Sequence, residues 1–245
     1  MHAYLKKKFG QNFLIDKNIL RKIINLVPAN NLNILEIGPG SGNLTELIID
    51  KNPAQLKLIE IDTDLIKELN LKFSKYNFID IINEDVLDAN IDHNYDVIIS
   101  NLPYNISSQI LSKIVLLKSP PKHLLLMFQK EFADRLLSSR LNSINSLVKC
   151  FYETKHEFNI GKNCFRPIPK VDSTLLSFYK HHDLLIKNNE IEKFINFKRK
   201  IFSHQRKTLK KVFRDYKIDI DIDKNLRIEN LSLIEFVSIF RKINF

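Results

Sequence analysis

The sequence predicts an α/β protein whose parallel sheet is covered by helices on both faces, followed by a small helical domain. Between residues 33 and 128, short and almost wholly apolar runs alternate with segments that carry apolar residues at helical spacing. From residue 188 onward the pattern is helical and basic. The polar stretch at 181–188 separates these patterns, so we expect domains of residues 1–182 and 183–245.

The expected elements follow one another in a regular order. Asp16 begins a helix that ends before Pro28, and Asp62 begins another. The expected strands are 33–37, 56–61, 78–82, 95–100 and 124–128. The expected helices between them are 43–50, 65–73 and 107–117. Beyond these we expect helices at 130–137, 144–151 and 231–241, and strands at 157–160 and 171–179 as an edge or antiparallel addition to the sheet.

Composition narrows the class of protein. With 245 residues, 44% of them hydrophobic, the chain can bury a sizeable core. It has neither the apolar run of about 20 residues that a membrane span needs nor the apolar stretch of a secretory signal. Two cysteines cannot form a disulfide framework, and the scattered histidines offer no metal site. We therefore expect a soluble, cytoplasmic monomer without a metal, with an organellar location as the alternative.

The net charge of +10 favours a polyanionic partner, although a composition rich in Lys, Asn and Ile also produces such an excess. The charge is concentrated in residues 193–214, which we call the basic segment. Its cations are Lys193, Lys198, Arg199, Lys200, Arg206, Lys207, Lys210, Lys211 and Arg214. Interleaved apolar residues predict amphipathic helices with a basic outer face. Such a face is often only solvated; contact with RNA phosphates is the alternative, which Lys6–Lys8 or Arg135–Arg140 could also provide.

A glycine-rich turn follows the first expected core strand. The segment Gly38–Asn43 lets the backbone approach a ligand closely, but Asn43 stands where a dinucleotide-binding turn needs a small residue. Glu60 ends the next strand, about 20 residues after the first glycine, where a carboxylate can bind a ribose diol. Asp85 follows the third strand and can accept a hydrogen bond from an adenine amino group, with Val86 against the ring. These positions share one edge of the sheet and favour a nucleoside-bearing ligand.

The fourth strand ends in the tetrapeptide Asn101–Tyr104, with the sequence NLPY. An adenine amino group is a poor nucleophile because its lone pair is delocalised. The Asn101 side-chain oxygen and the Leu102 carbonyl can accept hydrogen bonds from its two N–H groups. Pro103 fixes the turn, and Tyr104 offers a face on which an unpaired base can stack. The pattern indicates the transfer of a chemical group to an amino nitrogen. Catalysis would come from positioning and electrostatics, without a metal.

Five segments together resemble one family over nearly the whole chain. They are Lys8–Leu14, Glu36–Thr45, Asn101–Ser107, Phe128–Glu131 and Phe165–Ser173. In these segments the chain resembles the ribosomal small-subunit adenine dimethyltransferases, the KsgA/RsmA family. The resemblance implies a Rossmann-like class I fold that uses S-adenosylmethionine as cofactor.

The resemblance also implies the substrate and the site residues. The substrate would be the N6 amino groups of adenines, two adjacent ones that become dimethylated, near the 3′ end of small-subunit (16S) rRNA or of a pre-ribosomal small subunit. Residues 1–182 would be catalytic, and 183–245 would bind RNA. Tyr104 and Phe165 would form the walls of the target-base pocket, and Asn101–Tyr104 would be catalytic. The cofactor would contact Asn12, Leu14, Gly38, Pro39, Gly40, Glu60, Ile61, Asp85, Val86 and Asn101.

The chain departs from the family pattern at two places. Ser41 replaces a usual leucine, and residues 141–147 replace a Tyr-Gly and Leu-Ser pattern, which affects the loop there and any RNA contact it makes.

Three alternative functions stay open. An Erm-type 23S rRNA methyltransferase is disfavoured by Leu102 and the Asn105–Ser107 continuation. A binding protein of the mitochondrial transcription factor B type is disfavoured by the intact Asn101–Tyr104. A nicotinamide oxidoreductase is disfavoured by the glycine spacing.

Overall fold

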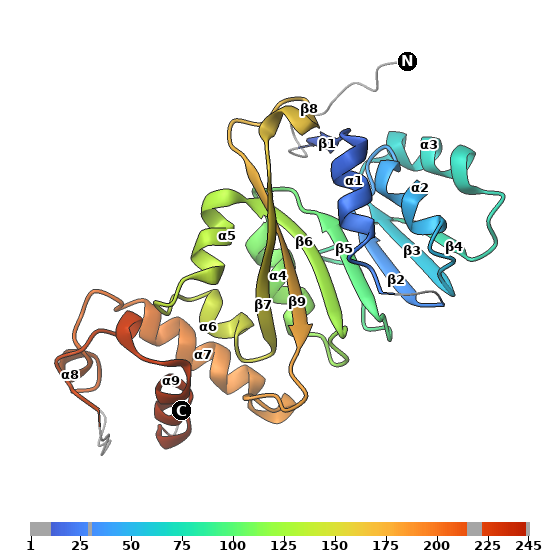
Figure 1. Ribbon diagram of the computed structural model, residues 1–245. Helices are drawn as coiled ribbons and strands as arrows, with labels where there is room; N and C mark the ends of the chain where they lie inside the picture. The colour runs from blue at the N-terminus through green and yellow to red at the C-terminus, as the bar shows by residue number, and fades with distance from the viewer. Residues whose placement is uncertain (1–10, 29–30, 215–221, 244–245) are drawn as a thin grey trace. The chain divides into compact units, whose positions relative to one another are not determined.

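The structure is a computed structural model that describes residues 11–28, 31–214 and 222–243. The chain divides into two compact units, whose elements are labelled in Figure 1. Unit 1 comprises Met1–Ala133 and Thr154–Lys180, and unit 2 comprises Asp134–Glu153 and His181–Phe245. Within the described ranges, no helix combines the length and the apolar composition that crossing a membrane requires.

Unit 1 is built on a seven-stranded mixed sheet with the strand order β4-β3-β2-β5-β6-β9-β7. The strands are β2 Asn33–Ile37, β3 Gln55–Glu60, β4 Ile79–Asn83, β5 Val97–Asn101, β6 His123–Gln129, β7 Tyr152–Ile160 and β9 Ser173–Lys180. Strands β2 to β6 run parallel to one another, and β9 is antiparallel to β6. This confirms the expected parallel sheet with an antiparallel addition. The strand order reverses between β2 and β5, and ligands bind at such a point in open α/β sheets.

Helices cover both faces of this sheet, as the sequence predicts. They are α1 Lys17–Ile24, α2 Asn43–Ile49, α3 Thr63–Phe73 and α4 Ser107–Val115. The first three lie toward one face, and α4 lies behind the strands (Figure 1). The Asp16 side chain accepts from the amides of Asn18 and Ile19, and that of Asp62 accepts from the amide of Asp64. Both expected N-caps are therefore confirmed, and they fix where α1 and α3 begin.

The core of unit 1 forms where α1 and α2 pack on the sheet. Leu20 and Ile23 of α1 and Ile48 of α2 are buried against Ile34 of β2 and Val97 of β5. Burial of each such side chain stabilises the fold by roughly 1.5–3 kcal/mol. This packing fixes the carboxyl ends of the central strands, from which the expected site residues project.

A second, two-stranded sheet was not expected. In it β1 (Phe13–Leu14) pairs antiparallel with β8 (Phe165–Arg166), and Leu14 lies opposite Phe165. Strands this short leave no periodic pattern in a sequence. The pairing ties an early segment of the chain to one that follows β7.

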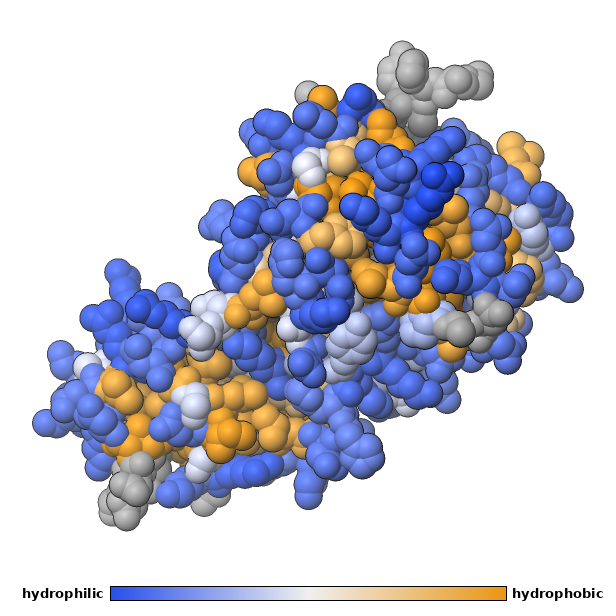
Figure 2. Space-filling view, viewed as in Figure 1, coloured by the Kyte–Doolittle hydropathy of each residue, from blue (hydrophilic) through white to orange (hydrophobic). Residues whose placement is uncertain are grey.

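Unit 2 is helical around an aromatic core. Its elements include α6 Asn145–Val148, α7 Ile191–Phe202, α8 Leu209–Val212 and α9 Leu233–Lys242. The rings of Phe194 and Phe197 in α7 lie 5.2 and 5.1 Å from those of Phe240 and Phe236 in α9, respectively. On the face viewed in Figure 2, apolar side chains gather over α7 between polar ones. Within the basic segment, Lys207, Lys210 and Lys211 are exposed and Leu209 is buried, as expected for an amphipathic segment.

The two units differ from the expected division at residue 182. Residues 134–153 group with the C-terminal helices, whereas the sequence pattern placed them with the sheet. The amide of Leu141 donates to the carbonyl of Glu229, and Lys198 Nζ donates to the carbonyl of Ser143. The expected helix at 144–151 is the shorter α6, and β7 begins at Tyr152 rather than at residue 157. Local periodicity does not reveal such long-range partners.

Candidate active site

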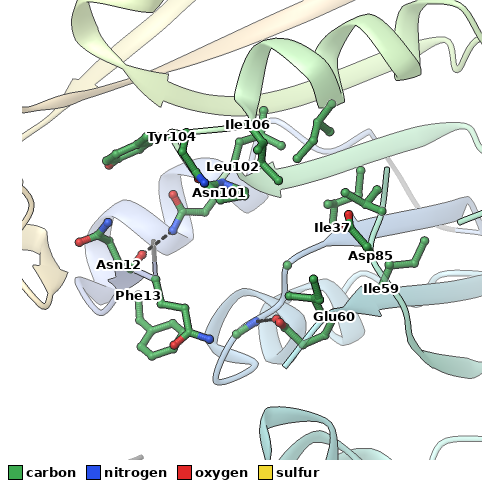
Figure 3. Close-up of a pocket in the computed structure, with 18 of the residues that line it drawn as sticks. Asn12, Phe13, Ile37, Ile59, Glu60, Asp85, Asn101, Leu102, Tyr104 and Ile106 are labelled. Atoms are coloured by element: carbon green, nitrogen blue, oxygen red, sulfur yellow. Dashed lines mark hydrogen bonds between the residues drawn. The ribbon is translucent and has the colours of Figure 1, made fainter. Parts of the chain in front are cut away.

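Unit 1 contains a cavity of about 250 Å³ at the carboxyl ends of its central strands. Residues from the ends of β2, β3 and β5 and from the turn after β4 line it, together with Gln11–Phe13. In Figure 3, Asn101 and Tyr104 lie along one side, and Glu60 and Asp85 lie along the other. The expected site residues that the structure brings together here are Asn12, Gly38, Gly40, Glu60, Ile61, Asp85, Val86 and Asn101–Tyr104.

The glycine turn combines positive backbone angles with close packing. Gly38 has a φ of +65°, and a Cβ built there would meet no atom within 4 Å. The backbone angle therefore favours glycine at this position, and the space beside it is open to a ligand. Gly40 differs, because a Cβ there would lie 2.7 Å from ring atoms of Phe13. The missing side chain at position 40 allows the Phe13 ring to form part of the cavity wall.

Glu60 ends β3 and is 6% exposed. Its Oε2 accepts a hydrogen bond from the amide of Gly40 at 3.2 Å, and its Oε1 accepts one from the amide of Asp62 at 3.0 Å. Burial raises the pKa of this carboxyl group, and the two amides partly offset the rise. The side chain is therefore held rigidly between the glycine turn and the start of α3, with further acceptor capacity toward the cavity.

The turn after β4 is fixed from two directions. The Oδ1 atom of Asp85 accepts from the amide of Leu87 at 2.8 Å. From α4, Lys113 Nζ donates to the carbonyls of Leu87 at 2.7 Å and Ala89 at 2.6 Å. These bonds engage one carboxylate oxygen of Asp85 and hold the turn in place. Val86 is buried beside it and lines the cavity.

Asn101 is oriented by a backbone carbonyl. Its Nδ2 donates to the carbonyl of Asn12 at 2.7 Å (Figure 3). A carbonyl can only accept, so the amide nitrogen must face Asn12 and the oxygen Oδ1 must face away from it. Figure 3 shows this oxygen on the side of Tyr104. The Oδ1 atom is thus presented as a hydrogen-bond acceptor in the cavity.

The turn after Asn101 is held locally. The side chain of Leu102 is buried, and the Ser107 hydroxyl donates to the carbonyl of Tyr104 at 3.2 Å. The amide of Ile106 donates to the carbonyl of Pro103 at 3.2 Å. Burial raises the pKa of the Tyr104 phenol, which therefore stays neutral at physiological pH.

Three expected site residues do not line this cavity. Leu14 and Pro39 line a smaller adjacent space of about 40 Å³. Phe165 is fully buried in the core beside Leu14 and faces neither space. The structure therefore gives no geometric support for Phe165 as a wall of the base pocket. Lys8–Gly10 of the first motif, and the alternative RNA contact at Lys6–Lys8, lie outside the described residues.

Sequence reasoning missed several residues at the site. Gln11 and Phe13 line the cavity, and Gln11 Nε2 donates to Asp62 Oδ2 at 2.9 Å. Their place beside Asn12 in the first motif was the available signal. Glu36, the first residue of the family segment Glu36–Thr45, lines the smaller adjacent space, is 2% exposed and accepts from the Thr45 hydroxyl at 2.6 Å. Burial raises its pKa to about 7, an effect that no sequence pattern reveals.

The hydrogen-bonding groups of the cavity fit a nucleoside that carries a positively charged group. The carboxylates of Glu60 and Asp85 suit hydroxyl and amino donors, apolar Ile61 and Val86 flank them, and the open space at Gly38 admits a chain close to the backbone. Across the stretches 11–28, 31–214 and 222–243, no group of three or more His, Cys, Asp or Glu residues could hold a metal ion.

The sheet and this site define a class I methyltransferase that uses S-adenosylmethionine. Two solved structures share the fold. A dimethyladenosine transferase from Plasmodium falciparum matches with a TM-score of 0.80 and 25% identity, over 94% of this chain and 98% of that one. The 23S rRNA methyltransferase ErmE matches with a TM-score of 0.76 and 21% identity over the same shares, so the fold alone does not identify the target of this chain.

The sequence comparisons identify the family. The profile described as ribosomal RNA adenine dimethylase matches residues 3–244. The chain is 39% identical to ribosomal RNA small subunit methyltransferase A of Pelagibacter ubique over 248 aligned residues, 94% of each chain. It is 41% identical to the protein of that name from Mycoplasma mobile, over 85% of this chain and 83% of the relative. The chain belongs to the ribosomal RNA adenine dimethylase family.

Proposed function

We propose that this protein transfers methyl groups to the N6 atoms of two adjacent adenines near the 3′ end of small-subunit rRNA, as a step in ribosome maturation. The names of the relatives from Pelagibacter ubique and Mycoplasma mobile support the choice of ribosomal subunit. The observation that carries the chemistry is the Asn101 amide, whose nitrogen is fixed on Asn12 and whose oxygen is presented in the cavity. We further propose that the protein acts as a monomer in the cytoplasm.

S-adenosylmethionine supplies an electrophilic methyl group on a sulfonium centre. We propose that Glu60 accepts hydrogen bonds from its ribose hydroxyls and that Asp85 accepts one from its adenine amino group. Ile61 and Val86 provide apolar contacts for the adenine ring. Asn12, Gly38 and Gly40 line the same cavity, and we propose that the methionine portion lies along them. Leu14 and Pro39 line the smaller adjacent space and directly follow or precede residues of this cavity, Phe13 and Gly40.

On the substrate side, Asn101 and Leu102 orient the amino group of the target adenine. The Asn101 Oδ1 atom and the Leu102 carbonyl each accept one N–H of the amino group, which draws the nitrogen lone pair out of conjugation with the ring. Pro103 limits the backbone freedom of this turn. Tyr104 stacks on the unpaired base. The gain in rate comes from orientation and from fixed dipoles, so no covalent intermediate with the protein is needed.

The basic segment of unit 2 is proposed to bind RNA through phosphates. Lys207, Lys210 and Lys211 are exposed cations within a short stretch of chain, and phosphate contacts of this kind give affinity without sequence specificity. In this proposal, target choice depends on the cavity in unit 1 and on the fold of the RNA. Residues 183–245, together with 134–153 of the same unit, would form the RNA-binding domain.

The decisive experiment uses both ribosomal subunits. Purified protein and labelled S-adenosylmethionine are incubated with small and large subunits that lack these methylations, and the modified nucleotides are mapped. Label at N6 of two adjacent small-subunit adenines, absent with the Asn101→Ala variant, is the expected result. Label on 23S rRNA would instead establish an Erm-type activity. Binding to small subunits without any transfer would favour a non-catalytic role of the transcription factor B type.

A further inference from the structure

A pair of hydroxyl groups joins the cavity to a distant strand. The phenol oxygen of Tyr104 lies 2.7 Å from Oγ of Ser173, a residue 69 positions further along the chain. Tyr104 lines the cavity, whereas Ser173 is fully buried and does not line it. Ser173 therefore reaches the cavity only through the ring of Tyr104.

Ser173 occupies a rigid place in the fold. It begins β9 and lies opposite Gln129 in the β6–β9 register. The preceding residue, Asp172, accepts hydrogen bonds from the amides of Lys130 at 3.0 Å and Lys162 at 2.9 Å. The following residue, Thr174, donates from its hydroxyl to the side chain of Asn159 at 2.9 Å. The strand is thus anchored on both sides of Ser173, and its hydroxyl has a fixed position.

Tyr104 lies in a less constrained segment, the turn between β5 and α4. Its carbonyl is held by Ser107, but a backbone bond does not fix the two side-chain torsions that set the plane of the ring. A hydrogen bond at the far end of the phenol fixes the direction of the ring axis, and because the phenol O–H bond prefers to lie in the ring plane, it also favours one orientation of that plane. The neutral phenol can donate to the Ser173 hydroxyl or accept from it.

We propose that Ser173 is a positioning residue that holds the ring of Tyr104 at the cavity wall before the target base arrives. The inference rests on the proposed function, in which Tyr104 stacks on the adenine to be methylated. A base that leaves its helix loses stacking, and a preformed aromatic face compensates for this loss without first having to become ordered. Removing the hydroxyl of Ser173 leaves the stacking face present but no longer oriented.

The chain offers a matched control on the same strand. Ser177 is also fully buried in β9, and among the described residues its hydroxyl has no hydrogen-bond partner. Ser177→Ala and Ser173→Ala remove the same atom from the same strand. Only the second breaks the bond to Tyr104. A general effect of losing a buried hydroxyl would appear in both variants.

The test measures ring order and methyl transfer separately. The protein is labelled with 3-fluorotyrosine, and Tyr104→Phe identifies the ¹⁹F signal of residue 104. Ser173→Ala should shift or broaden this signal in the absence of RNA, and Ser177→Ala should leave it unchanged. With unmethylated small subunits, Ser173→Ala and Tyr104→Phe should each lower kcat/KM roughly three- to tenfold, the range for one hydrogen bond. The double variant should be no worse than either single one, because both lose the same bond.

Several outcomes would overturn the proposal. An unchanged fluorine signal in folded Ser173→Ala would mean that the serine does not order the ring, and this readout requires no enzymatic activity. Losses that multiply in the double variant would show that the two hydroxyls act independently. A failure of the proposed function gives results that differ from a failure of the positioning role of Ser173. It would appear as wild-type protein that does not modify small-subunit adenine, or as Tyr104→Ala with undiminished transfer, and either result would overturn the inference as well.

Discussion

The cavity of unit 1 and the basic segment of unit 2 differ in how their polar groups are held. In the cavity, Glu60 accepts two backbone amides and Asn101 is fixed by the carbonyl of Asn12. In the basic segment, Lys207, Lys210 and Lys211 extend from an exposed surface. Binding in the cavity depends on the direction and distance of individual hydrogen bonds, whereas binding by the basic segment depends on the number of charges. The cavity should therefore be sensitive to the loss of single atoms, and the basic segment should be sensitive to salt.

The largest expected effect follows removal of the Asn101 side chain. Asn101→Ala deletes the acceptor for the target amino group, and we expect kcat to fall about 10²- to 10³-fold, as for other groups that stabilise a transition state. The fold should stay intact, and the cofactor affinity should change much less than kcat, because the proposed ribose and adenine acceptors Glu60 and Asp85 are untouched. Rates are measured on unmethylated small subunits, with calorimetry of cofactor binding as the control. Transfer near the wild-type rate by a folded variant would remove Asn101 from the mechanism.

The next effect concerns pH and Glu36. Burial, with the nearby charge of Glu60, raises the pKa of Glu36 from 4.5 to about 7, against an opposing bond from Thr45. The folded protein holds this proton more tightly than the unfolded chain. The contribution of Glu36 to stability is therefore fully present below pH 4.5 and is lost as pH rises to about 7. The loss is on the order of 3 kcal/mol.

Glu36→Gln removes the titration and keeps an acceptor for Thr45. Urea unfolding at pH 5 and pH 8 should therefore give a smaller pH dependence for the variant than for wild type. The variant should gain stability relative to wild type at pH 8. Parallel curves for the two proteins would show that Glu36 is already ionised in the folded state.

A smaller effect is expected for the cofactor when Glu60 is changed. Glu60→Ala removes the proposed ribose acceptor, so S-adenosylmethionine affinity should fall roughly ten- to a hundredfold, as for a hydrogen bond to a charged group. Glu60→Gln keeps one acceptor and should lie between wild type and Glu60→Ala in calorimetry. NADH binding in place of S-adenosylmethionine by wild type would refute the cofactor assignment.

The effect expected in the basic segment depends on the salt concentration and is the smallest of these effects at high salt. Replacing Lys207, Lys210 and Lys211 with Gln removes three charges and little apolar packing. If each neutralises one phosphate, the slope of log affinity for small-subunit RNA against log salt becomes shallower by about two to three. Cofactor affinity and the identity of the methylated nucleotides should persist.

A matched triple variant sharpens this comparison. Lys17, Lys67 and Lys75 are exposed lysines of unit 1, and their replacement by Gln removes the same charge. The salt slope of this control should stay close to that of wild type. An unchanged slope in the first variant would mean that the basic segment is a solvated face and that RNA is held elsewhere, as at Arg135–Arg140.

The sequence predicted those parts of the site that follow from local pattern and topology. Glu60, Asp85 and Asn101 were expected at one edge because parallel strands end there, and the structure brings them to one cavity. The expectation for Phe165 had no such basis. It came from resemblance alone, and the ring lies in the core, where its pairing with Leu14 places it.

What the sequence could not reveal are the partners of side chains within loops and the contacts between distant residues. Residues 141–147 depart from the family pattern, and their loop is closed from within by Asn145. Its Nδ2 donates to the carbonyls of Ser138 at 3.2 Å and Arg140 at 2.9 Å, while its Oδ1 accepts from the amide of Asn142 at 2.8 Å. An asparagine in a helical pattern indicates none of these partners. The grouping of residues 134–153 with unit 2 was missed for the same reason.

The pairing of β1 with β8 has a consequence for the timing of synthesis. Asn12, whose carbonyl orients Asn101, directly precedes β1, and β1 finds its strand partner in Phe165–Arg166. These partners are translated about 150 residues later, a delay on the order of ten seconds at common elongation rates. A nascent chain can form β2 to β6 during this interval, but its cavity lacks a strand-paired wall. The enzyme therefore acquires its catalytic geometry late in its own translation.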